Sequence, residues 1–209
     1  MKTVYFSLII LLFSSQSILA QKSKPLNPKG IYSEIKVAKQ NKMIQELIDT
    51  KTSASSIETI FNNINQYNPP VLYVFSQALF VNGELQTGID WYLFAQLNAL
   101  YDANRCSDKT ARQATTILES KFRPAYEDYI KSNKQAYLES IDKVVMLFNK
   151  IPQDYDIRWI NLHGMDAVTT SLSDEKENKN DLSLPKESWP EIKEKTIGQF
   201  IEANRNSVK

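Results

Sequence analysis

The sequence predicts an all-α protein, and three observations support that class. Apolar residues recur three or four positions apart along most of the chain, which is the spacing of a helix with one buried face. Segments that alternate polar and apolar residues with the period of a strand are few. Residues that start or stop helices, such as Pro69, Gly83 and Pro124, flank the periodic segments.

The periodic segments place the helices in order along the chain. One apolar stripe covers residues 31–48 and a second covers residues 57–64, ahead of a helical hairpin described below. After the hairpin, Ser107 or Asp108 can cap a helix whose apolar face ends at Leu118. The remaining expected helices are a short one from Pro124, a longer one over residues 136–148 that stops before Pro152, and a last one from Trp189-Pro190 to Ile201.

Residues 69–105 carry the strongest pattern, that of two antiparallel helices joined by a tight turn. Pro69 and Pro70 suit the first turn of a helix, because a missing N–H group costs nothing there. Asn82-Gly83 lies where a left-handed C-terminal cap belongs, ahead of a short polar turn. The two apolar stripes are Leu72, Phe75 and Leu79, and then Ile89, Tyr92, Leu93, Leu97 and Leu100.

Small residues fall among the large ones of this hairpin, and Gly88 is the most informative of them. A glycine inside a helix costs about 1 kcal/mol relative to alanine, so its presence needs a reason. Together with Ser76 and Ala95, Gly88 would let the two helices approach closely. We therefore expect Gly88 to pack against a neighbouring backbone, opposite Phe75 and Ser76.

This hairpin resembles the tetratricopeptide and Sel1-like repeat superfamily, in which small residues mark the helix crossing and a glycine marks the turn. Ile89-Asp90-Trp91-Tyr92 is similar to the Trp-Tyr of Sel1-like second helices. The resemblance covers about one repeat, so neighbouring helices must supply the rest of the core. It implies antiparallel helical hairpins that form a protein-binding scaffold. The matching positions are Leu72, Phe75, Ser76, Leu79, Gly83, Gly88, Tyr92 and Ala95.

The first 20 residues have the features of a signal peptide. Lys2 gives a positive start, residues 4–13 form an almost unbroken apolar run, and residues 14–20 end in a small cleavage residue, Ala20. The apolar run has about half of the ~20 residues that a transmembrane helix needs. We expect a soluble protein that is exported, periplasmic or extracellular, with no stable membrane insertion after processing.

The sequence divides into one helical domain and shorter segments. The linker is assigned from a polar tract of mixed charge with almost no apolar anchor, which predicts a mobile connection. The expected divisions are a signal peptide over residues 1–20, a flexible N-terminal segment over 21–30, the helical domain over 31–170, the polar linker over 171–186 and a C-terminal helix over 187–209.

Composition narrows the range of partners. Lys and Arg total 25 against 24 Asp and Glu, a balance that gives no positive field for nucleic acid or anionic lipid. We therefore expect a protein partner and no nucleic acid. Cys106 is the only cysteine, so the chain has no internal disulfide. The single histidine and the scattered carboxylates lack metal-ligand spacing, and no motif indicates a cofactor.

Two polar clusters contain residues that could take part in function. The first lies between two expected helices and offers Arg105, Arg112 and one thiol, that of Cys106. Arg105 can pair with Asp102 or Asp108, and Cys106 has no neighbouring histidine that would convert it to a thiolate. We interpret this cluster as structural and Cys106 as unreactive, and we retain Arg105 and Arg112 as candidate binding residues.

The second cluster, residues 154–166, is the better functional candidate because it concentrates aromatic, basic and acidic side chains. If it is α-helical, Arg158 shares a face with Asp154, and Trp159 and His163 lie one turn apart. Such a unit could hold the core together, or it could anchor a partner, since Arg and Trp are favoured in binding hot spots. The candidate binding residues here are Asp156, Arg158, Trp159, His163 and Asp166.

Taken together, these patterns favour a non-catalytic protein-binding module, with a periplasmic immunity or inhibitor protein as its narrower form. We assign no catalytic residue, because no nucleophile and base occur in a recognisable arrangement. The alternative is a small periplasmic hydrolase in which Asp156 or His163 acts as the acid or base.

Overall fold

The computed structural model describes residues 27–49, 51, 53–173 and 181–209, and it confirms the all-α class. Within these ranges the regular structure is helical, apart from one isolated antiparallel bridge between Cys106 and Ser183. The expected signal peptide, most of the flexible N-terminal segment and residues 174–180 of the expected linker lie outside the described residues.

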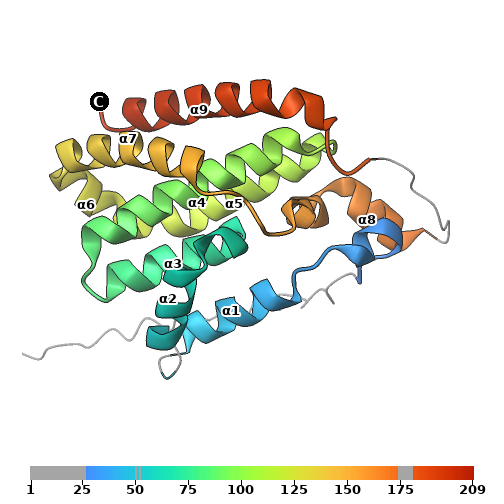
Figure 1. Ribbon diagram of the computed structural model, residues 1–209, viewed down its shortest axis with the longest axis horizontal. Helices are drawn as coiled ribbons and strands as arrows, with labels where there is room; N and C mark the ends of the chain where they lie inside the picture. The colour runs from blue at the N-terminus through green and yellow to red at the C-terminus, as the bar shows by residue number, and fades with distance from the viewer. Residues whose placement is uncertain (1–26, 50, 52, 174–180) are drawn as a thin grey trace, which may run out of the picture.

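Most helices follow one another through short connections, whereas residues 173–185 separate α8 from η6 (Figure 1). The α-helices are α1 (Ala38–Ile48), α2 (Ser53–Asn62), α3 (Pro69–Val81), α4 (Leu85–Arg105), α5 (Gln113–Phe122), α6 (Glu127–Ser132), α7 (Lys134–Lys150), α8 (Met165–Leu172) and α9 (Trp189–Asn206). Short 3-10 helices are η1 (Gly30–Glu34), η2 (Ile64–Gln66), η3 (Lys109–Arg112), η4 (Arg123–Tyr126), η5 (Ile157–His163) and η6 (Lys186–Ser188).

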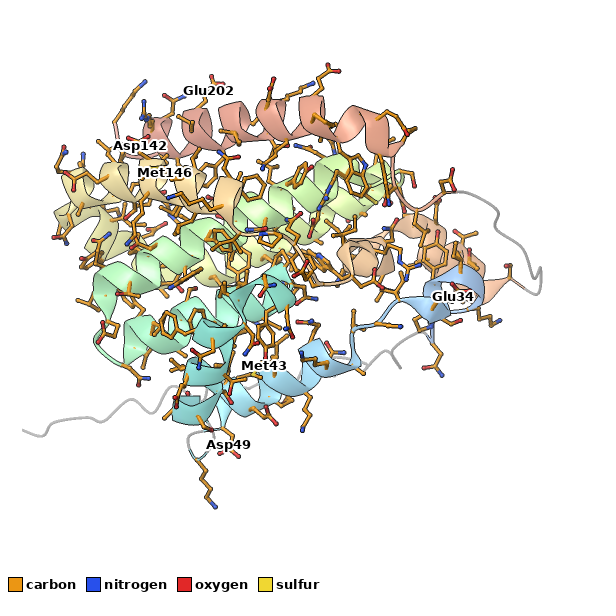
Figure 2. All side chains as sticks on the ribbon, viewed as in Figure 1. Glu34, Met43, Asp49, Asp142, Met146 and Glu202 are labelled. Atoms are coloured by element: carbon orange, nitrogen blue, oxygen red, sulfur yellow. The ribbon has the colours of Figure 1, made fainter. Side chains whose placement is uncertain are left out.

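Helix α4 forms the centre of the fold. It packs against α3, α5, α7 and α9, so most of its surface is covered (Figure 1). Ile89, Tyr92 and Leu93 on this helix are fully buried. The outer faces of α7 and α9 are polar or exposed, as Asp142, Met146 and Glu202 show (Figure 2). The described helices include none that is long and apolar enough to cross a membrane.

The hairpin of α3 and α4 forms where the sequence predicts it. The Asn68 side chain accepts from the Val71 N–H, and prolines occupy the first turn of α3. Gly83 has a φ of +93°, the left-handed conformation of a glycine cap. A Cβ atom at Gly88 would lie 2.9 Å from Phe80 Cβ and 3.0 Å from the Ser76 carbonyl oxygen. The helices therefore cross in close contact at Gly88, as expected, although Phe80 rather than Phe75 is its nearest neighbour.

Three segments differ from expectation: residues 31–48, residues 157–163 and the expected linker over residues 171–186. Residues 31–48 are not one helix: Ile35 is extended after η1, which lets Tyr32 and Ile35 pack with Ala167 and Leu182 before α1 begins. Residues 157–163 form the 3-10 helix η5, and α8 follows as a separate helix after Gly164.

The expected linker over residues 171–186 is not free at its described ends. Helix α8 continues to Leu172, and Leu182 is only 6% exposed, so the tract does contain an apolar anchor. The Ser107 N–H donates to the Leu182 carbonyl at 3.3 Å, and the Leu184 N–H donates to the Arg105 carbonyl at 2.7 Å. These bonds fix residues 182–184 against the end of α4.

Candidate binding cavity at the end of α4

The sequence-predicted site residues separate into three places. Arg105, Asp156 and Arg158 line one large cavity together. Trp159 and His163 line a second, smaller cavity, which also contains Asn68 and Leu118. Asp166 lies in the first turn of α8 and Arg112 ends η3, and neither lines these two cavities.

The larger cavity, called here the Arg105 cavity, has a volume of about 940 Å³. It lies where the ends of α4 and α7 meet the start of α9, with residues 151–158 and 181–186 completing the wall. This volume is at the upper end of the range that binds small molecules or short peptide segments. The residues on which the following argument depends are Tyr101, Arg105, Phe148, Tyr155, Trp189 and Lys193.

Beneath the cavity, the buried carboxylate of Asp102 organises a hydrogen-bond network. Arg105 Nη2 donates to Asp102 Oδ1 at 2.5 Å, while Trp159 Nε1 and Tyr155 Oη donate to Oδ2 at 2.7 and 3.0 Å. Burial raises the pKa of Asp102, and the nearby Arg105 charge and the three donors oppose that rise. Gln153 extends the network by accepting from Arg105 Nη2 at 2.7 Å and donating to Asn98 at 2.6 Å.

Arg105 has an incomplete set of partners despite being buried. Its residue is 3% exposed, and its guanidinium carbon lies 3.8 Å from the Tyr101 ring centroid and 4.6 Å from that of Trp189. Arg105 Nε is buried without a hydrogen-bond partner among the described residues. Leaving a buried donor unsatisfied costs about 1–3 kcal/mol, so this N–H group calls for an explanation.

The charged residues of the cavity wall are mostly basic. Its lining includes five basic residues and two acidic ones, Asp156 and Asp181. Asp156 is engaged by Arg158, and Arg105 is paired with Asp102 below the wall. The basic residues that remain are Lys150, Lys186 and Lys193.

Lys193 contacts an aromatic ring instead of a carboxylate. Its Nζ lies 5.0 Å from the Phe148 ring centroid. Burial, assisted by the positive charge of Arg105, lowers the pKa of Lys193. The positive charges of Arg105 and Lys193 therefore repel each other at one end of the cavity.

Asp156 and Arg158 form a local unit, but not the one that an α-helix would give. In η5 the Asp156 side chain caps the helix by accepting from the Arg158 N–H at 3.1 Å, and it accepts twice from the guanidinium, at 2.9 Å each. The α-helical condition for placing Arg158 on one face with Asp154 is not met, because η5 is a 3-10 helix, and Asp154 accepts from Asn65. Burial opposes ionisation of Asp156, but the Arg158 and Lys36 hydrogen bonds prevail and lower its pKa.

Trp159 is not an exposed anchor. It is 2% exposed and its indole N–H donates to Asp102, so its side chain packs in the interior, and its part in partner binding stays a prediction. The expected proximity of Trp159 and His163 is confirmed, with ring centroids 5.7 Å apart. His163 lies at the surface, yet neighbouring atoms desolvate its imidazole and lower the pKa of His163 below its ordinary value of 6.5.

Asp166 belongs to a junction between η3 and α8. Asp108 Oδ2 accepts from the Asp166 N–H at 3.1 Å, while Asp108 Oδ1 accepts from the Thr110 N–H at 2.8 Å. A Cβ atom at Gly164 would lie 1.9 Å from Asp108 Oδ2, so only glycine leaves room for this double cap. Arg112 is exposed at the end of η3. The junction explains the polar residues here without invoking a ligand.

Cys106 has the surroundings of a structural residue. It is 1% exposed, and its Sγ lies 3.1 Å from Asn161 Oδ1 as a donor. Burial raises the pKa of the Cys106 thiol to about 11. The thiol is therefore protonated at neutral pH, when it is a poor nucleophile.

The cavity residues that were not candidates from the sequence include Tyr101, Gln153, Trp189 and Lys193. Trp189 and Lys193 are one turn apart on α9, four residues from each other, with Trp189 at its start. Their shared helical face is visible in the sequence. Its position against Arg105 is not, because the partner lies 84 residues earlier in the chain, by the residue numbers.

No group of three or more His, Cys, Asp or Glu side chains is arranged for a metal ion in the part of the chain that the structure describes. Comparison with known proteins adds no assignment: no family model matches the chain, and no curated protein or solved structure matches it significantly.

Proposed function

We propose that this chain is an exported, non-catalytic protein-binding module whose binding face is the Arg105 cavity. The observation that carries the proposal is a large cavity whose wall includes several basic and aromatic side chains, set on a network of buried hydrogen bonds. A wall fixed in this way is suited to binding, because its groups need little reordering when a partner arrives. An immunity or inhibitor protein that occludes a toxin is the narrower form of this role.

The α3–α4 hairpin would serve as the scaffold behind this face. We infer that it is a single repeat of the tetratricopeptide or Sel1-like kind, with the surrounding helices completing its core. Gly83, Gly88 and the buried Ser76 support this relationship, since the first allows the turn and the other two allow the close crossing. Because α4 also carries Arg105, the hairpin would position the binding face directly.

The alternative, a small hydrolase using Asp156 or His163, has weaker support from the geometry. Asp156 accepts hydrogen bonds from Arg158 and Lys36, which occupy its carboxylate and lower its pKa. A general base of this kind would have little tendency to take a proton near neutral pH. His163 lines the other cavity, so the two residues do not share one site.

Retention of a partner by the immobilised protein tests the proposal. The full chain, expressed for export, is presented to periplasmic and culture-medium extracts of its own host beside a heat-denatured sample. Quantitative mass spectrometry should show one protein that the native sample retains. The Arg112→Ala variant, whose side chain is exposed and lies outside the cavity, should retain nearly the same amount of that protein as the native sample does. Absence of such a protein, with hydrolase turnover that disappears in His163→Ala, would favour the enzyme instead.

A further inference from the structure

We propose that the Arg105 cavity is a carboxylate-binding subsite, which takes the carboxylate of a peptide segment next to an apolar side chain. The inference deepens the proposed function, on which it rests for the choice of binding face. Its basis is a juxtaposition of two features at one end of the cavity: a buried guanidinium with a free N–H group, and a second cation without a carboxylate partner.

The guanidinium of Arg105 supplies the first feature. Nη2 is committed to Asp102 and Gln153, whereas Nε has no acceptor among the residues that the structure describes. Arg105 lines the cavity, so an acceptor placed there can approach its guanidinium. A carboxylate oxygen entering from the cavity would complete the donor set of Arg105 with a charge-assisted hydrogen bond.

Lys193 supplies the second feature. Its ammonium contacts the Phe148 ring, and it has no ion pair with a described carboxylate. The pKa of Lys193 is lowered first by burial and then by the charge of Arg105. Asp102 balances one of these two positive charges, and a bound carboxylate would balance the other.

The apolar side chains of the cavity walls favour a carboxylate that is attached to an apolar group. Tyr101, Phe148 and Trp189 present aromatic rings, and Ile151 and Leu184 add aliphatic surface. Inorganic anions would gain nothing from these walls, whereas a carboxylate beside an apolar side chain would bury that side chain against them. The volume of about 940 Å³ is sufficient for more than a single ion.

The test uses N-acetylphenylalanine as the probe, with N-acetylphenylalaninamide as its uncharged counterpart and inorganic phosphate as the bare anion. Binding is followed on ¹⁵N-labelled full-chain protein through the Arg105 Nε–H and Trp189 indole N–H resonances. We expect saturable shifts with the acid, and binding at least about tenfold weaker for the amide and for phosphate, because a charge-assisted bond and apolar contacts must act together.

Two variants make the result specific. Lys193→Gln, at a partly exposed position on α9, should weaken binding of the acid about tenfold at an unchanged melting temperature. Lys134→Gln, at an exposed position at the start of α7 and outside the cavity lining, should leave binding unchanged. Arg105→Lys should abolish binding of the acid. If the Arg105→Lys variant fails to fold, the affinity of Lys193→Gln for the acid decides whether the subsite exists.

Several results would overturn the subsite: no saturable shift with the acid, equal shifts with acid and amide, binding of phosphate as tight as that of the acid, or an unaltered affinity in Lys193→Gln. These outcomes are separable from failure of the proposed function. A retained partner whose binding is insensitive to Lys193→Gln refutes only the subsite, whereas probe binding without any retained protein refutes only the protein-binding role.

Discussion

Two carboxylates beside α4 have similar numbers of hydrogen-bond donors but different surroundings. Asp102 accepts from Arg105, Tyr155 and Trp159, under a large cavity. Glu119 accepts from Tyr73, from Tyr92 at 2.6 Å and from Gln96 at 2.9 Å, and it lines neither cavity described above.

The two clusters differ in the charge of their hydrogen-bond donors and in whether all of the donors' N–H groups have acceptors. Around Glu119 all three donors are neutral, and burial, reinforced by Glu119, raises the pKa of both Tyr73 and Tyr92, so these phenols keep their protons. Around Asp102 one donor is a guanidinium that retains an unused N–H group. The Glu119 cluster is therefore built from neutral donors, whereas the Asp102 cluster holds a charged group that lines the cavity.

The largest expected effect comes from changing each carboxylate to its amide. Asp102→Asn leaves the Arg105 charge buried without compensation and should reduce the free energy of unfolding by about 3–5 kcal/mol. Glu119→Gln removes no charge partner from its neutral donors and should reduce it by about 1 kcal/mol. Urea denaturation of the two variants measures both, and equal losses would contradict the distinction between the clusters.

The hairpin crossing, remote from both carboxylates, provides the next effect. Gly88→Leu would force side-chain atoms into the 2.9–3.0 Å space beside Phe80 and Ser76, so the free energy of unfolding should fall by about 1–3 kcal/mol. A lower urea midpoint at unchanged slope is the expected result. An unchanged or higher midpoint would show that the crossing tolerates bulk and would remove the packing argument for the hairpin.

The α3–α4 hairpin and the Arg105 cavity differ in how far the sequence predicts them. The hairpin was predictable because its determinants are local: the prolines, Gly83 and the apolar stripe of α4 all act on neighbouring residues. The cavity was only partly predictable. Arg105, Asp156 and Arg158 could be named as candidates from their chemistry, but the docking of Trp189 and Lys193 against Arg105 depends on how α9 packs on α4.

The conformation of residues 157–163 was mispredicted for a related reason. Helical spacing alone does not separate a 3-10 helix from an α-helix in a segment this short. The capping of η5 by Asp156 and the burial of Trp159 over Asp102 favour the tighter form, and the latter is a long-range contact. Trp159 therefore belongs to the network beneath the Arg105 cavity and not to its rim.

A smaller effect on stability is expected at the rim. The Arg158 side chain is 33% exposed and pairs with Asp156, so Arg158→Ala should change the free energy of unfolding by less than about 1 kcal/mol. It should nevertheless weaken partner capture by about 2 kcal/mol, because Arg158 lines the cavity. Thermal melting by circular dichroism and a pull-down are measured together. A marked drop in melting temperature without a specific loss of capture would assign Arg158 to the scaffold.

The smallest effect is expected at Cys106, which is buried near Asp102 in sequence but outside the cavity lining. Because burial raises its pKa to about 11, native protein should react slowly with a thiol reagent between neutral pH and pH 9, and rapidly only once denatured. Mass spectrometry of the labelled protein follows the reaction. Complete labelling of native protein within minutes at neutral pH would reveal an accessible, activated thiol.

Photo-crosslinking from the two ends of α7 tests most directly whether partners bind at the Arg105 cavity. Lys150 is exposed and lines the cavity, whereas Lys134 is exposed at the opposite end of the same helix, about 24 Å away at 1.5 Å per residue. A benzophenone amino acid replaces each lysine in turn, and the protein is irradiated with the retained partner. We predict a covalent adduct from position 150 and none from position 134; an adduct from position 134 alone, or equal adducts from both, would contradict the central claim.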